Sequence, residues 1–167
     1  MADLHNIFQF VAIGVAREPI AAAMRGLGDE GDVKYMVLSA TPVTNADFQV
    51  VGQMEKMRSL TVCNTEIDDE GLRAVGKLEG LTSLRLRDET GKRLTAAGLA
   101  HLRNLRQLEW LTLEGPGFGD EAVKALTGDM LPRLHSLTLT GCEVRTDLLR
   151  ELKRQRPKIS TYLHELY

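Results

Sequence analysis

Short blocks in which apolar and polar residues alternate recur along most of the chain. Each block reads L-x-x-L-x-L, with apolar residues at its first, fourth and sixth positions. Alternation over so few residues predicts a short strand with one buried face. Successive blocks are 24, 24, 27, 26 and 25 residues apart. They begin at Val33, Met57, Leu81, Leu108, Leu134 and, in a partial sixth copy, Ile159.

The second half of each copy has the apolar spacing of a helix. Apolar residues follow at i, i+3 and often i+6, as in Leu72, Val75 and Leu78. Asp69 and Asp120 precede two of these stretches and are predicted to cap the helices of their own copies. One such unit is too small to bury its apolar faces alone, so the copies are expected to stack. The predicted adjacent parallel strands lie near residues 36–38, 60–62, 84–86, 111–113 and 137–139.

This pattern resembles the leucine-rich-repeat family, and more narrowly its short-repeat bacterial and cysteine-containing branches, which read roughly LTxLxLxxTxVTDxGLxxLxxL. The resemblance covers about residues 33–165. It implies an α/β solenoid with a parallel β-sheet on the concave face, short helices on the convex face, and a role in protein binding. The position that carries Asn in many members holds Thr41, Thr65 and Cys142 here. Pro116 stands there in the fourth copy and cannot satisfy backbone groups as Asn does, so we expect a local irregularity.

The ends of the chain fit the repeat less well. Residues 1–32 are predicted to form a helical cap, residues 33–158 five repeats, and residues 159–167 a partial repeat or cap, all in a single domain. A second helix would begin at Pro19. A strand over residues 8–13 is the alternative to the first helix. The predicted apolar face of that first helix carries Leu4, Ile7, Phe8, Val11 and Val15.

Composition narrows the function. The formal net charge of −2 argues against a protein that coats nucleic acid, and no apolar run approaches the length of a membrane-spanning helix. The N-terminus lacks the basic residues of a signal peptide, and two cysteines are too few for a disulfide framework. We therefore expect a cytoplasmic protein that needs no cofactor, binds another protein rather than nucleic acid or membrane, and is monomeric when alone.

The candidate partner-binding residues come from the polar positions of the predicted strands, which project from the concave sheet. Aromatic and arginine side chains are common anchors of interfaces, and the only tryptophan lies here. A second interpretation is that Arg87 and Glu114 merely pair across strands while Trp110 fills a groove beside an insertion. The predicted binding residues are Tyr35, Arg58, Arg85, Arg87, Glu109, Trp110, Glu114 and His135.

The insertion, the two cysteines and one group of polar residues are further candidates for a functional site. The three-residue insertion in the third copy, within DETGKRL, is either part of the binding face or drift in a tolerant loop. Cys63 and Cys142 are three copies apart, about 14 Å, which is too far for a disulfide. The alternatives to simple binding are an enzymatic or metal site on the surface of Glu109, Glu114 and His135, or a recognition fragment of a larger receptor. Two ligands are too few for a metal, so we expect no enzyme and no metal site.

Overall fold

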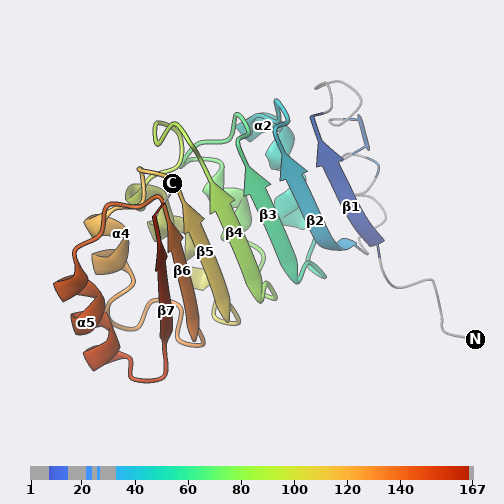
Figure 1. Ribbon diagram of the computed structural model, residues 1–167. Coiled ribbons are helices and arrows are strands. Elements are labelled where there is room, and N and C mark those ends of the chain that lie inside the picture. The colour runs from blue at the N-terminus through green and yellow to red at the C-terminus, as the bar shows by residue number, and fades with distance from the viewer. Residues whose placement is uncertain (1–7, 15–21, 24–25, 27–32, 166–167) are drawn as a thin grey trace, which may run out of the picture.

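The protein is described by a computed structural model that covers residues 8–14, 22–23, 26 and 33–165. Among these residues, seven strands form one open parallel sheet in chain order (Figure 1). The five predicted strands are adjacent and parallel, as expected. The strands are β1 (Phe8–Ile13), β2 (Val33–Ser39), β3 (Ser59–Cys63), β4 (Ser83–Arg87), β5 (Trp110–Glu114), β6 (Ser136–Thr140) and β7 (Ser160–His164).

The core lies between the sheet and the helices, which Figure 1 shows on one side of it. Rows of aliphatic side chains run across neighbouring strands, and Leu60, Leu84 and Leu111 in one such row are at most 1% exposed. The predicted division into core and outward positions is therefore correct over these strands. The helices, of which η marks the 3-10 type, are α2 (Asn45–Phe48), η2 (Val51–Gln53), α3 (Leu72–Val75), η3 (Ala96–Asn104), α4 (Asp120–Ala125) and α5 (Thr146–Gln155).

A left-handed residue follows several of the strands and turns the chain toward the helices. Asn64, Gly115 and Gly141 have φ angles of 48°, 122° and 61°. The amide of each donates to the last carbonyl of the next strand, as from Asn64 to Arg87 at 2.8 Å. At Gly115 a Cβ would stand 2.1 Å from the carbonyl oxygen of Asp88, so only glycine fits there.

The N-terminal segment corrects one prediction. Residues 8–13 are a strand, β1, which pairs with β2, so the helical interpretation is wrong there and the strand alternative is right. Ala12 is buried opposite Leu38, and Gly14 repeats the left-handed turn with φ of 63°. Residues 8–14 thus repeat the strand and the turn of the other copies. Most of the predicted second helix lies outside the described residues.

The two predicted helix-capping acids contact the next repeat instead of their own helix. Asp69 accepts hydrogen bonds from the amide and hydroxyl of Thr95, at 2.8 and 2.6 Å. Asp120 accepts from the amide of Arg145 at 2.8 Å. The α3 and α4 helices begin without a side-chain cap. Equivalent turns of stacked repeats lie side by side, so a carboxylate can reach the neighbouring turn as easily as its own.

The sixth copy is displaced by one residue from the predicted register. Ser160 rather than Thr161 pairs with Ser136, and Leu163 pairs with Leu139. Ile159 remains buried, so the sixth copy has one residue fewer than the fifth between its first apolar position and its strand. Leu163 is 39% exposed because β7 is the last described strand and no further repeat covers it.

Candidate functional site

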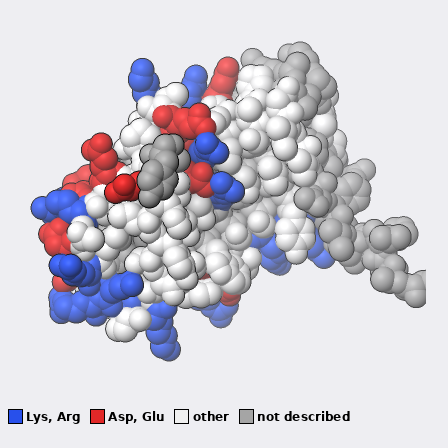
Figure 2. All heavy atoms as spheres, viewed as in Figure 1, with Lys and Arg blue, Asp and Glu red and all other residues white. Residues whose placement is uncertain are grey.

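The candidate site lies on the open face of the sheet, the face turned away from the helices. It carries the third, fifth and seventh residues of each repeat, which the pairing register places in rows across the strands. Charged side chains of both signs gather near the carboxyl ends of the middle strands, and others lie along the edges of the molecule, while most of the sheet's face between them is uncharged (Figure 2).

Two arginines enclose one carboxylate at the centre of the open face. The Nε atom of Arg85 lies 2.5 Å from Oε1 of Glu114, and the Nε atom of Arg87 lies 3.7 Å from Oε2. The side chain of Glu114 is only 11% exposed, whereas those of Arg85 and Arg87 are 49% and 36% exposed. Hydrogen bonding to Glu114 raises the pKa of Arg85 above its ordinary value. The expected cross-strand pairing of Arg87 with Glu114 is therefore present, with Arg85 as the closer partner.

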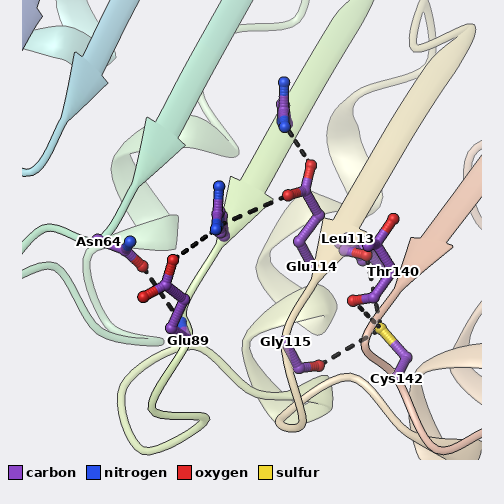
Figure 3. Close-up of polar contacts among 9 residues, drawn as sticks. Asn64, Glu89, Leu113, Glu114, Gly115, Thr140 and Cys142 are labelled. Carbon is purple, nitrogen blue, oxygen red and sulfur yellow. Dashed lines mark hydrogen bonds and ion pairs between the residues drawn. The ribbon is translucent and has the colours of Figure 1, made fainter. Parts of the chain in front are cut away.

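A second carboxylate reaches this cluster from the insertion. Glu89 accepts a hydrogen bond from Arg87, and its amide donates to the side chain of Asn64 at 3.2 Å (Figure 3). The side chain of Glu89 is 55% exposed, so the ion pair between Arg87 and Glu89 is accessible to solvent. We call Arg85, Arg87, Glu89 and Glu114 the charged cluster.

Trp110 lies on the open face at the start of β5 and is 46% exposed. Its ring meets that of His135 edge-on, with 5.0 Å between the centroids and 63° between the planes. The insertion follows Arg87, which pairs with Glu114 at the opposite end of the strand. Trp110 is therefore about 13 Å from the insertion, and the interpretation that it fills a groove there is wrong.

The other predicted residues are more scattered. Tyr35 is 44% exposed on β2, three strands and about 14 Å from Trp110. Arg58 donates to the carbonyls of Met57 and Gly80 at 3.0 and 3.3 Å, so its guanidinium ties the turn before β3 to the next repeat. The fold thus brings the predicted residues together in two groups, Trp110 with His135 at the start of the strands, and Arg85 and Arg87 with Glu114 toward their ends.

The surface weighed as an enzymatic or metal site is not assembled. Glu109 precedes β5 and Glu114 ends it, so about 16 Å of strand separates their backbones. His135 lies next to the Glu109 end. No group of three or more metal-ligating side chains is found within the described ranges.

Asp88 organises the insertion loop, for which the sequence left open either a part of the binding face or drift in a tolerant loop. One of its oxygens accepts from the amide and hydroxyl of Thr90, and the other from the amides of Arg93 and Leu94, at 2.6–3.1 Å. Burial alone would raise the pKa of Asp88, but these hydrogen bonds outweigh it and hold the pKa below its ordinary value. Asp88 is 6% exposed, so the loop is built around a buried anion.

The two cysteines form no disulfide with each other, as predicted, and both are buried. Burial raises the pKa of both thiols. Cys142 stands at the family's Asn position, and its thiol lies 3.5 and 3.4 Å from the carbonyl oxygens of Leu113 and Gly115 (Figure 3). The Cys142 thiol thus donates to backbone carbonyls just before Pro116, a residue that has no amide hydrogen of its own to donate.

These features are those of a leucine-rich-repeat fold, an open parallel sheet in chain order with short helices on one side of it. Among solved structures, the chain is similar to a leucine-rich-repeat protein of Leptospira interrogans, with a TM-score of 0.52 and 17% identity over 81% of this chain and 32% of that one. This likeness confirms the predicted fold. No family model matches the chain, and no curated protein matches it.

Two further structures are similar. An internalin (inlF) from Listeria monocytogenes has a TM-score of 0.44 and 18% identity, over 84% of this chain and 52% of that one. TLR13, in a complex with ssRNA13, has a TM-score of 0.48 and 14% identity, over 88% of this chain and 28% of that one. The chain spans about a third of the Leptospira protein and about half of the internalin. No helix within the described residues is long and apolar enough to cross a membrane.

Proposed function

We propose that the chain is a protein-interaction module, an adaptor, inhibitor or regulatory subunit, that binds a partner protein on the open face of its sheet. The observation that carries this proposal is Trp110, a large apolar side chain left 46% exposed between Ser83 and Ser136 of the neighbouring strands. Tryptophan and arginine are the residues most often found as energetic anchors of protein interfaces.

The shape of the surface supports binding rather than catalysis. The open face is a broad sheet, and its central carboxylate is already neutralised by two arginines. A catalytic acid or base needs a proton to exchange and a water-poor cavity, whereas a paired carboxylate on an open sheet serves to hold its arginines in place. The buried, unpaired cysteines suit a reducing compartment, so we place the interaction in the cytoplasm.

The test compares variants in affinity purification from native extract with quantitative mass spectrometry, followed by titration of the purified partner. Trp110→Ala and Arg85→Glu are each expected to weaken binding by about thirtyfold, which corresponds to about 2 kcal/mol. Arg103→Glu is the matched control because Arg103 is exposed on η3, in the helical layer.

Each variant is first checked for an unchanged circular-dichroism spectrum. A partner that Trp110→Ala and Arg103→Glu retain equally well would show that the open face is not the interface. The same conclusion would follow if only the helical-layer variant lost binding.

A further inference from the structure

We propose that the partner segment held on the open face is an extended acidic peptide in which an apolar residue and two carboxylates alternate with small residues. This inference rests on the proposed function and adds the chemistry of the partner. It places the apolar side chain on Trp110 and the two carboxylates on Arg85 and Arg87.

The two arginines of the charged cluster reach further into the solvent than Glu114, the acid on the sheet itself, while Glu89 from the loop is exposed as well. Glu114 lies between the arginines, and the side chains of Arg85 and Arg87 each have more than three times its exposed fraction. Arg85 contacts Glu114 only through Nε, and its two terminal nitrogens have no hydrogen-bond partner among the described residues. A guanidinium with free terminal donors binds a carboxylate in two-point geometry.

Glu89 shows that the cluster accepts a carboxylate from outside the sheet. It belongs to the insertion loop rather than to a strand, and it already occupies one terminal nitrogen of Arg87. This contact is exposed, so a carboxylate of the partner can displace it at little cost. Glu89 therefore acts as the chain's own competitor for the proposed peptide.

The spacing of the three anchors matches that of an extended peptide. Trp110 pairs with Ser83, so Trp110, Arg85 and Arg87 occupy successive outward levels along two neighbouring strands. Successive levels are about 6.6 Å apart, which is also the distance between residues i and i+2 of an extended chain. A segment running along the strands thus places one apolar and two acidic side chains over the three anchors in turn.

The insertion loop closes the far end of this track. Its fold is fixed by Asp88, and its exposed residue Arg93 turns back to donate to the carbonyl of Glu66 at 3.3 Å. The donors offered to a peptide at that end are therefore those of Arg85 and Arg87, which favour acidic side chains there and leave the apolar one at the Trp110 end.

The probe is the peptide acetyl-Ser-Leu-Ser-Glu-Ser-Glu-Ser-amide, titrated into the full chain while the fluorescence of its single tryptophan is followed. The matched control peptide has glutamine in place of both glutamates, at equal ionic strength. We expect a saturable change for the acidic peptide with a dissociation constant around 1 mM. The glutamine peptide should bind about tenfold more weakly, since two exposed ion pairs are lost.

Three variants sharpen the test. Arg85→Gln should weaken the acidic peptide about threefold, Glu89→Gln should tighten it about threefold by removing the competitor, and Arg103→Gln should leave it unchanged. All three are compared at a temperature at which their circular-dichroism spectra match that of the original chain.

Equal binding of the two peptides, or no saturable change with either, would overturn the inference. So would a Glu89→Gln variant that binds the acidic peptide no more tightly. If these tests fail while partner capture still depends on Trp110, the acidic chemistry is wrong and the binding face stands. If partner capture is independent of Trp110, the proposed function itself fails.

Discussion

Replacing Asp88 by asparagine is expected to destabilise the protein more than its modest change in size suggests. Each carboxylate oxygen of Asp88 accepts two hydrogen bonds, so all four donors meet an acceptor. Asparagine offers one oxygen only, and its amide group would face two donors in either orientation. Loss of two hydrogen bonds to a buried charge costs about 3 kcal/mol, or roughly 6–12 °C in melting temperature for a domain of this size.

The assay is thermal and urea unfolding of Asp88→Asn beside Glu89→Gln, an exposed neighbour whose change should stay within about 0.5 kcal/mol. The pKa of Asp88 is lowered by folding, so its contribution is complete above the unfolded value of about 3.9 and is lost as the pH falls toward the folded value. The gap between Asp88→Asn and the original chain should therefore narrow below about pH 4. An Asp88→Asn variant that melts with the original chain at pH 7 would refute this account of the loop.

Two further stability predictions separate core, surface and connections between repeats. Leu113→Ala, at a fully buried site, should lower the free energy of unfolding by about 2–5 kcal/mol, whereas Trp110→Ala should lower it by no more than about 1 kcal/mol. If the two variants lose comparable stability in a thermal melt, Trp110 belongs to the core. Arg156 donates to four main-chain carbonyls between residues 126 and 134, so Arg156→Met should cost about 2–3 kcal/mol in urea unfolding. Arg154→Met, which breaks only an exposed ion pair, is its control and should stay within about 0.5 kcal/mol; equal effects would contradict the role of Arg156.

The sheet could be predicted from the sequence because every repeat has the same pattern of apolar and polar positions. One L-x-x-L-x-L block is ambiguous, but five blocks in one register fix the strands, their order and their buried faces. The same logic failed at the N-terminus, where the apolar run around Phe8–Ile13 fits both helical and strand spacing. Gly14 was the missed signal, because it occupies the place of the left-handed residue that follows other strands.

Polar residues in the turns were harder to assign than apolar ones. An acid before a helix looks the same in sequence whether it caps that helix or the next repeat, as Asp69 does with Thr95. Asp88 gave no sign of its role either, because its four hydrogen bonds depend on how the insertion folds back on itself. Apolar residues are placed by periodicity alone, whereas the partners of a polar side chain depend on local geometry that the pattern does not contain.

The charged cluster falls between these two cases. Three of its members, Arg85, Arg87 and Glu114, come from two neighbouring strands, so the repeat register alone places Arg87 beside Glu114. The register does not say that Arg85 takes the closer contact or that Glu89 reaches Arg87 from the loop. In the observed side-chain arrangement Glu114 is buried, and the terminal nitrogens of Arg85 have no partner among the described residues. Because those donors are exposed, the predicted ion pair is also a surface that suits the carboxylates of the proposed partner.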